Sequence, residues 1–283
     1  MTPIKTLDGR VALITGATQD GIGRATARRL ASAGVSVVLH GSRDSSVPGL
    51  EDGCRIITEA GGKAAFVVAD LASDSARANL LERAAADFGP ISILVNNAAA
   101  ITAYAPASKI DFAARDAMFE INFHAPIDLI QQALPAMREA GWGRIINLSS
   151  NSTSPPDLPM VGLPMMHKLA LYGASKGALD RYTVGLAAEL HGTGISVSGV
   201  LPHAVAWVSN ADNLARMMLK VAPHKVETTE MMAEAIYLLT ETGLTGIVSE
   251  SRAILQMLQR PLHALDGVTV IGDATSLVEE PAA

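Results

Sequence analysis

Two ionisable side chains, Tyr172 and Lys176, lie four positions apart in the run LALYGASKGAL. On a helix this spacing places both side chains on one face. Tyrosine alone is a poor base near neutral pH, because its usual pKa is about 10. A lysine ammonium about 4 Å away, at an effective dielectric constant near 20, favours the phenolate by up to ~4 kcal/mol. The pair is therefore either a proton-transfer device or part of a packed helix, and the rest of the sequence must decide between them.

Composition argues against several classes of protein. The chain has 283 residues, of which 49% are hydrophobic and 18% charged, so disorder is not expected. A net charge of −6 without a long basic run argues against a nucleic-acid or anionic-membrane partner. The single Cys54 cannot form an internal disulfide, and no Cys/His cluster has metal-ligand spacing. The N-terminus shows no signal-peptide core and no apolar run is long enough to span a bilayer, so we expect a cytoplasmic protein without a metal.

Apolar strands alternate with helical segments along the chain. The expected strands cover residues 10–15, 35–40, 64–69, 91–95, 143–149 and 194–200. The expected helices cover residues 22–33, 49–60, 73–88, 111–139, 172–191 and 227–241. Strands that are apolar on both faces are typical of a parallel sheet covered by helices. The alternation predicts an α/β fold, a doubly wound parallel sheet of right-handed βαβ units, with residues 1–283 forming a single domain.

Three segments depart from this alternation. Residues 151–168 contain four prolines and are expected to form a substrate loop, while residues 202–226 contain a short amphipathic piece expected to act as a lid. Residues 250–283 form a C-terminal extension. The apolar residues of the loop and lid are Met160, Val161, Leu163, Met165, Met166, Leu169, Met217 and Met218. They favour an apolar substrate pocket under a mobile lid, and the alternative is packing on the core.

The glycine-rich turn TGATQDGIG follows the first expected strand. Glycines at 16, 21 and 23 let the main chain turn sharply and approach a phosphate, and the helix that opens near Ile22 offers free amides. The position of the turn in a βαβ unit favours dinucleotide binding over a simple tight turn. The carboxylate of Asp20 would repel a pyrophosphate, so we expect it to point outward or to cap the helix.

The end of the second strand, LHGSRD, indicates which dinucleotide is bound. A site for NAD usually has an acid here that binds the ribose 2′-hydroxyl. This chain instead has His40, Gly41, Ser42 and Arg43, a donor-rich set that suits a 2′-phosphate, with no acid before Asp44. The cofactor is therefore expected to be NADP(H), with NAD(H) less favoured. Alternatively, Arg43 is a solvated loop residue.

With the glycine-rich turn, the NNAAA run at residues 96–100 and the YGASK run at residues 172–176, the sequence resembles the short-chain dehydrogenase/reductase family over roughly residues 7–249. The resemblance implies a Rossmann-type fold with about seven parallel strands and a homo-oligomer, a dimer or tetramer, built on the long helices. It also implies four catalytic residues, Asn122, Ser150, Tyr172 and Lys176. Tyr172 would be the general acid/base, Ser150 would hold the substrate oxygen, Lys176 the nicotinamide ribose, and Asn122 a water that links Lys176 to solvent.

The resemblance and the glycine turn together define the expected cofactor contacts. They are Gly16, Thr18, Gln19, Gly21, Ile22, Gly23, Ser42, Arg43, Asp70, Leu71, Asn97, Ala98, Ala99, Tyr172, Lys176 and Pro202. Within this set, Asp70 matches the residue that contacts the adenine in the family.

Several positions depart from the family pattern. The glycine turn is one residue longer, Ala99 replaces a glycine, and the interval from Ser150 to Tyr172 is longer than usual. His203 replaces a glycine of the family pattern. Trp207 replaces the threonine that, in the family, holds the nicotinamide amide. We therefore predict an NADP-dependent oxidoreductase that interconverts a carbonyl and a secondary alcohol on a small, fairly apolar molecule. The alternatives are a non-reductive epimerisation or elimination on the same fold, or a cofactor-binding protein without turnover.

Overall fold

A seven-stranded parallel sheet forms the centre of the protein, with the strand order β3-β2-β1-β4-β5-β6-β9. The computed structural model describes residues 7–154, 168–208 and 211–278. The strands are β1 (Val11–Ile14), β2 (Ser36–Gly41), β3 (Lys63–Val68), β4 (Ile93–Asn96), β5 (Gly143–Leu148), β6 (Ile195–Leu201) and β9 (Val248–Glu250). The strand order reverses between β1 and β4, where doubly wound sheets bind their ligands. The predicted fold is confirmed.

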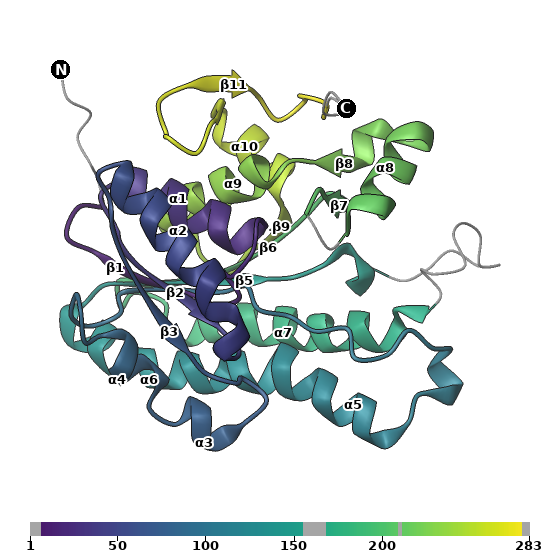
Figure 1. Cartoon of the computed structure of the whole chain (residues 1–283), viewed down its shortest axis with the longest axis horizontal. Coiled ribbons are helices and arrows are strands. Elements are labelled where there is room, and N and C mark those ends of the chain that lie inside the picture. Colours follow the sequence, from purple (N-terminus) through teal and green to yellow (C-terminus); the bar gives the residue numbers. More distant parts are fainter. Residues whose placement is uncertain (1–6, 155–167, 209–210, 279–283) are drawn as a thin grey trace.

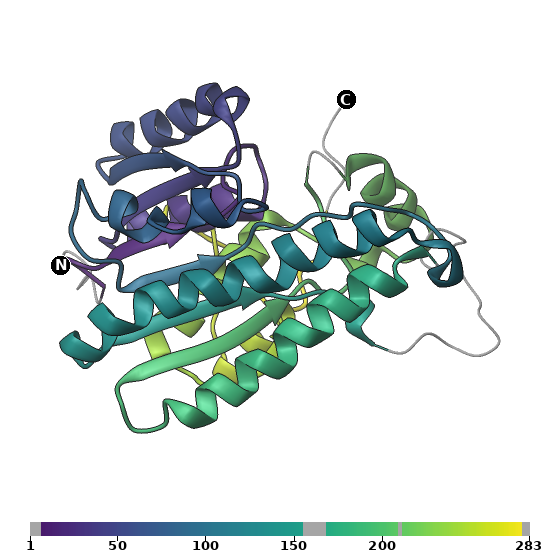
Figure 2. The same ribbon diagram turned by 90° about the horizontal axis from the view of Figure 1, so that it is seen from below.

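Helices cover both faces of the sheet, as Figure 1 shows. The upper layer in this view contains α1 (Ile22–Ser32), α2 (Val47–Glu59), α9 (Thr229–Thr242) and α10 (Ser251–Leu258). The lower layer contains α3 (Asp74–Arg77), α4 (Leu80–Ala84), α5 (Phe112–Phe119), α6 (Ala125–Ala140) and α7 (Ala170–Glu189). Seen from below, α7 lies alongside α5 and α6, which follow each other along one line (Figure 2). On this side, α7 contacts α5 and the turn that joins α5 to α6.

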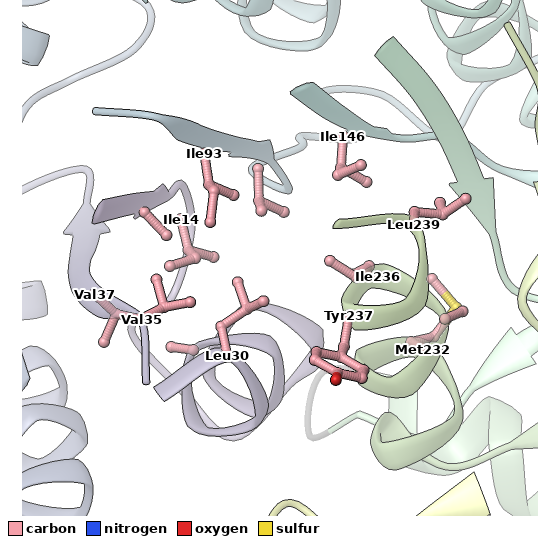
Figure 3. Close-up of a cluster of buried hydrophobic side chains, with 14 of the residues drawn as sticks. Ile14, Leu30, Val35, Val37, Ile93, Ile146, Met232, Ile236, Tyr237 and Leu239 are labelled. Carbon is pink, nitrogen blue, oxygen red and sulfur yellow. The ribbon is translucent and has the colours of Figure 1, made fainter. Parts of the chain in front are cut away.

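The centre of the sheet is buried on both faces, and β1 is apolar and buried at all four positions. On β1, Ile14 joins the cluster that contains Leu30 of α1 and Ile236 of α9, and Figure 3 shows these three side chains together. The preceding residue of β1, Leu13, points to the opposite face of the sheet and joins the cluster that contains Leu129 of α6. Alternate residues of a strand point to opposite faces, so the continuous apolar run is what a two-sided core requires.

Two of the predicted helices are interrupted. The segment 73–88 contains two short helices, because Ser73 caps α3 by accepting from Ala76 N at 3.4 Å and Asn79, at φ −127°, separates α3 from α4. The segment 111–139 contains a single π turn, Glu120–His124, between α5 and α6. A π turn inserts one residue into a helix and is frequent at functional sites.

The remaining elements lie at one edge of the sheet and in the C-terminal extension. They are the paired strands β7 (Val205–Ala206) and β8 (Val226–Glu227), α8 (Asp212–Val221), and the antiparallel pair β10 (Leu262–His263) and β11 (Val270–Gly272). His263 contacts the buried Glu234 of α9 at 3.0 Å, and Glu234 pairs with Arg29 of α1 at 2.5 Å. The C-terminal extension is therefore docked on the α1–α9 layer.

The substrate-loop and lid predictions are only partly covered by the structure. The amphipathic piece of residues 202–226 is a helix, α8, as expected. Residues 155–167, which include Met160, Val161, Leu163, Met165 and Met166, lie outside the described residues. No helix in the described part of the chain is long and apolar enough to cross a membrane.

Candidate active site

A cleft of about 840 Å³ opens at the carboxyl ends of β1 and β4. Thirteen of the expected cofactor residues line it: Gly16, Thr18, Gln19, Gly21, Ile22, Gly23, Ser42, Arg43, Asp70, Leu71, Asn97, Ala98 and Ala99. The cleft is also lined by Asp20, His40, Ala100, Ile121 and Val208. The other three expected residues, Tyr172, Lys176 and Pro202, are not among those that line it.

The glycine turn is shaped by close contact with the segment after β4. Gly16 has φ +69°, and a side chain there would place its Cβ 2.9 Å from the Cα of Ala98. A Cβ on Gly23 would lie 2.6 Å from Nδ2 of Asn97. Asn97 fastens the two segments together, because its Nδ2 donates to the carbonyls of Thr15 at 2.7 Å and Gly16 at 3.0 Å. These positions therefore require glycine for packing.

Gly21 differs from the other two glycines of the turn. A Cβ there would meet nothing closer than 3.8 Å, the distance to Val208 Cγ1. Gly21 is the N-cap of α1, which has no side-chain cap, so the free main-chain amides of the first turn face the cleft. A phosphate fits this arrangement because the amides and the helix dipole both favour a negative group.

Arg24 supports the turn from beneath, a role that the sequence reasoning missed. Its guanidinium is buried and donates to the carbonyls of Thr18 at 2.9 Å and Gly49 at 2.6 Å. It also pairs with Asp52 at 2.9 Å and with Asp20 at 3.1 Å. Asp20 does not cap α1, so that alternative is wrong. Its carboxylate is exposed and pairs with Arg24, but Asp20 also lines the cleft, so the structure does not turn it away from a bound phosphate. The sequence feature that could have indicated this role is the position of Arg24, a basic residue directly after the last glycine of the turn.

His40 does not belong to the expected set of phosphate donors. Its ring is 1% exposed, Nδ1 accepts from the Gly16 amide at 3.3 Å, and Nε2 lies 2.9 Å from the Ala69 carbonyl. The neutral tautomer with a proton on Nε2 satisfies both contacts, and burial lowers the pKa of His40 to about 4. His40 instead joins the glycine turn to the end of β3.

The donors available at the end of β2 are Ser42 and Arg43, which are both exposed and line the cleft. Asp44 begins a 3₁₀ turn, Asp44–Ser46, and is not among the residues that line the cleft. Asp70 lies across the cleft, where its Oδ1 accepts from the Ala72 amide at 2.9 Å. The cleft is therefore lined by an arginine that follows β2 and by an aspartate that follows β3.

Lys176 is buried beneath the end of β5. Its side chain is among the largest fully buried ones, and Nζ donates to the Leu148 carbonyl at 2.7 Å. Burial lowers the pKa of Lys176 to about 8, and the carboxylate of Asp180 acts in the opposite direction. The lysine is therefore poised between charged and neutral forms near physiological pH.

Tyr172 has a raised pKa, not the lowered one that the Tyr–Lys spacing suggested. Burial raises the pKa of Tyr172 to about 12, the hydrogen bond with Ser150 lowers it, and Tyr104 raises it. Desolvation of the phenolate exceeds any benefit from the neighbouring lysine in this arrangement. Tyr172 is therefore a neutral phenol near pH 7, and proton donation from it requires a nearby positive charge that stabilises the phenolate.

Ser150 is fixed at the end of β5 opposite the first turn of α7. It begins the 3₁₀ turn Asn151–Thr153, where its Oγ accepts from the amide of Ser152 at 3.2 Å and from its hydroxyl at 2.9 Å. A Cβ on Gly173 would overlap the Ser152 carbonyl, so glycine lets α7 approach this turn closely. The structure therefore brings Ser150 and Tyr172 together across the long interval in the sequence.

Asn122 lies within the π turn and is completely buried. Its Oδ1 accepts from the Ala100 amide at 2.8 Å, and its Nδ2 donates to the Ala100 carbonyl at 2.9 Å and to Ser175 Oγ at 3.1 Å. Ala100 lines the cofactor cleft. The side chain of Asn122 therefore connects the cleft to the helix of Tyr172 and Lys176. Both Nδ2 hydrogens are already donated, so a water bound by Asn122 would donate to its side-chain or main-chain oxygen.

Trp207 stands where the family has a threonine and makes a different contact. Its Nε1 donates to Asp212 Oδ1 at 2.8 Å, and Asp212 also pairs with Arg216 at 3.0 Å. The indole thus fastens the start of α8 to the loop after β6. In the same loop, His203 Nδ1 lies 2.5 Å from Glu250 Oε2 at the end of β9. In the described ranges, no group of three or more His, Cys, Asp or Glu side chains could hold a metal ion.

Comparisons with known proteins agree with this geometry. A sequence profile described as short chain dehydrogenase matches residues 10–219. Ketoacyl reductase HetN of Nostoc sp. is 30% identical over 93% of this chain and 86% of that protein. Cis-4-hydroxycyclohexanecarboxylate dehydrogenase of Sinomonas cyclohexanicum is 32% identical over 87% of this chain and 94% of that protein.

Solved structures with the same arrangement include two that hold NADP. A putative NAD(P) dependent gluconate 5-dehydrogenase from Beutenbergia cavernae, with NADP bound at low occupancy, matches with a TM-score of 0.75 and 31% identity over 88% of this chain and 97% of that chain. A 3-oxoacyl (acyl-carrier-protein) reductase from Agrobacterium tumefaciens, with NADP bound, gives a TM-score of 0.75 and 28% identity over 87% and 97% of the two chains.

Proposed function

This chain belongs to the short-chain dehydrogenase/reductase family, and we propose that it is an NADP-dependent enzyme that interconverts a carbonyl and a secondary alcohol on a small, fairly apolar molecule. The observation that carries the proposal is the connection through Asn122. This one side chain bonds both to Ala100 in the cleft and to Ser175, which lies between Tyr172 and Lys176 on α7. The cleft and the proton-transfer residues are thereby parts of one site.

The residues of the cleft fit NADP(H). Gly16 and Gly23 form a cradle that a Cβ would fill, and Gly21 leaves the amides of α1 open to a pyrophosphate. Arg43 and Ser42 would hold the 2′-phosphate, and Asp70 would contact the adenine. The bound NADP in related structures supports the same choice. When bound, the cofactor supplies or accepts the hydride, which is the redox half of the reaction.

The protein's own residues would handle the proton. Ser150 would donate a hydrogen bond to the substrate oxygen and hold it against Tyr172. Tyr172 would protonate that oxygen during reduction and would recover the proton during oxidation. Lys176 would hold the nicotinamide ribose and stabilise negative charge as the proton leaves Tyr172.

The proposed substrate is apolar because the side chains near the loop after β6 are apolar or already paired. Trp207 presents an indole whose N–H is occupied by Asp212, and α8 adds Met217 and Met218. The relative named cis-4-hydroxycyclohexanecarboxylate dehydrogenase supports a ring-borne secondary alcohol as the reacting group, although the compound in that name also carries a carboxylate. We further propose a single-domain, cytoplasmic protein that assembles as a dimer or tetramer through α5–α6 and α7.

Two other functions are also candidates, and specific residues bear on each of them. Ala99 and Trp207 alter the surroundings of the nicotinamide relative to the family, which motivates a non-reductive epimerisation or elimination. A cofactor-binding protein without turnover is the other candidate, but the assembled set of Ser150, Tyr172 and Lys176 argues against it.

Steady-state oxidation of NADPH with a panel of cyclic and acyclic ketones and aldehydes tests the proposal. Turnover with apolar ketones, and slower turnover with NADH, is the expected result. Tight NADPH binding without oxidation by any member of the panel would favour the two other candidates.

A further inference from the structure

Asp180 is a carboxylate that lies next to the proton-transfer residues and has no role in the mechanism so far. It follows Lys176 by four positions on α7, so the two side chains share one face of the helix. Its Oδ2 accepts a hydrogen bond from the hydroxyl of Ser149 at 2.8 Å. Ser149 is buried at the end of β5 and directly precedes Ser150. Asp180 therefore touches the strand end that carries one catalytic residue and lies one helical turn from another.

The buried Lys176 ammonium needs a counter-charge. Its hydrogen-bond acceptor, the Leu148 carbonyl, is neutral, and among the described residues Lys176 takes part in no direct ion pair. A buried ammonium is unfavourable unless a negative group compensates for its lost hydration. Burial lowers the pKa of Lys176, and Asp180 is the charged group that raises it. The pKa of Asp180 is raised by its own burial and lowered by Ser149 and Lys176, in that order.

Other charged groups around α7 are engaged elsewhere. The elements packed against α7 carry His124 and the charged residues Arg115, Asp116, Glu120, Arg144 and Glu250. Glu120 pairs with Arg77 at 2.6 Å, Glu250 contacts His203, and Arg144 stacks on Trp142. Asp116 and Arg115 are exposed on α5, and His124 lies exposed at the end of the π turn. None of these is among the groups that shift the pKa of Lys176.

We propose that Asp180 is a positioning residue for catalysis: its carboxylate is the counter-charge that keeps Lys176 an ammonium, and its bond to Ser149 fixes the strand end at Ser150. The proposal rests on the proposed function, since it gives Lys176 and Ser150 their catalytic roles. Asp180 itself touches neither substrate nor cofactor in that scheme. Its two contributions are separable, because one depends on charge and the other on a hydrogen-bond acceptor.

Carbon NMR of protein labelled at the lysine Cε tests the first contribution without any substrate. The chain has seven lysines, and the Lys176 signal is assigned as the one that disappears in Lys176→Arg. In the wild type this signal is expected to titrate near pH 8. Asp180→Asn, which still accepts from Ser149, is expected to lower that midpoint by about one pH unit, since the raising charge is gone.

Control variants separate the effect of the Asp180 charge from structural effects of substitution. Asp116→Asn, an exposed carboxylate on the neighbouring α5, is expected to leave the Lys176 midpoint unchanged. Ser149→Ala keeps the Asp180 carboxylate but raises its pKa, so it is expected to lower the Lys176 midpoint by less than Asp180→Asn does, and to lower kcat because Ser150 loses its support. Should Asp180→Asn unfold, Asp180→Ser removes the same charge with a smaller side chain and is expected to give the same downward shift.

Two results would overturn the proposal. One is a Lys176 midpoint that stays the same in both uncharged Asp180 variants. The other is a Ser149→Ala shift as large as that of Asp180→Asn. Failure of the proposed function has a different signature, because a wild type without turnover would still show the Lys176 titration and its dependence on Asp180.

Discussion

Asn122 donates a hydrogen bond to Ser175 at 3.1 Å, and this contact joins the π turn to the helix that carries Tyr172 and Lys176. Ser175 in turn donates to the Tyr172 carbonyl at 2.8 Å. Asn122 also pairs with both main-chain polar groups of Ala100, which lines the cofactor cleft. One buried amide side chain thus connects the cleft to α7.

Asn122→Ala is expected to weaken both folding and function. The substitution leaves the amide and carbonyl of Ala100 without partners, so the free energy of unfolding should fall by roughly 2–4 kcal/mol. NADPH affinity and turnover should fall with it, because Ala100 moves. Ser175→Ala, the matched control, removes one hydrogen bond and should lose about 1 kcal/mol. Urea unfolding and NADPH fluorescence titration measure both, and equal effects of the two variants would contradict this account.

Arg43→Ala should change the choice of coenzyme. NADPH carries a 2′-phosphate and NADH does not, so removal of this exposed cation should weaken NADPH binding at least about tenfold and leave NADH binding nearly unchanged. Arg55→Ala, an exposed arginine on α2 that does not line the cleft, serves as the control. Equal losses of affinity for both coenzymes, or tighter binding of NADH by the wild type, would mean that Arg43 is a solvated residue that does not contact the 2′-phosphate.

Substitutions at two glycines of the turn should distinguish an effect on NADPH binding from an effect on protein stability. A Cβ at Gly23 would lie 2.6 Å from Asn97, so Gly23→Ala should lower the melting temperature as well as NADPH affinity. A Cβ at Gly21 has open space, so Gly21→Ala should keep the melting temperature within a few degrees and weaken only NADPH binding. Loss of stability in Gly21→Ala, or unchanged NADPH affinity, would show that no phosphate approaches this residue.

Glu227 should make the stability of the protein depend on pH. It is fully buried, and burial raises its pKa from 4.5 to about 7, against the opposing effects of Ser251 and Arg252. Because the folded state resists its ionisation, the resulting loss of stability is complete above about pH 7 and disappears as the pH falls towards about 4.5. Glu227→Gln should therefore stabilise the protein by roughly 1–3 kcal/mol at about pH 8 and by much less near pH 4.5.

Thermal unfolding of Glu227→Gln at the two pH values checks this expectation. Glu51→Gln, an exposed glutamate on α2, should show no such dependence on pH. A gain that is equal at both pH values would mean that Glu227 acts through shape and not through its charge.

The sheet could be predicted from sequence because its signal is local. The expected strands are short runs rich in aliphatic residues, and the observed bounds of β1, β2 and β5 differ from the expected ones by one residue at each end at most. The helix at 73–88 was predicted as continuous because apolar spacing alone does not reveal a break. The break depends on the cap at Ser73 and the conformation of Asn79.

Thirteen residues that the motifs indicated line one cleft, whereas contacts between distant segments could not be predicted from sequence. Ser42 and Arg43 line the cleft as expected, but His40 is turned inward by contacts with Gly16 and Ala69. The raised pKa of Tyr172 likewise depends on its burial, which spacing on a helix does not reveal. Arg24 and Asp180 emerged only from the packing of α1 on α2 and of α7 on β5.

The measurement that tests the central claim most directly is hydride transfer from NADPH deuterated on the transferring position of the nicotinamide. Mass spectrometry of the product should find deuterium on the carbinol carbon of the alcohol formed from the ketone that reacts best. Tyr172→Phe should bind NADPH with nearly unchanged affinity and form no labelled alcohol, because its ring packs as before but carries no proton to donate. Product without deuterium, or a Tyr172→Phe rate within a few fold of the wild type, would contradict the assignment of an NADP-dependent carbonyl–alcohol oxidoreductase with Tyr172 as its acid.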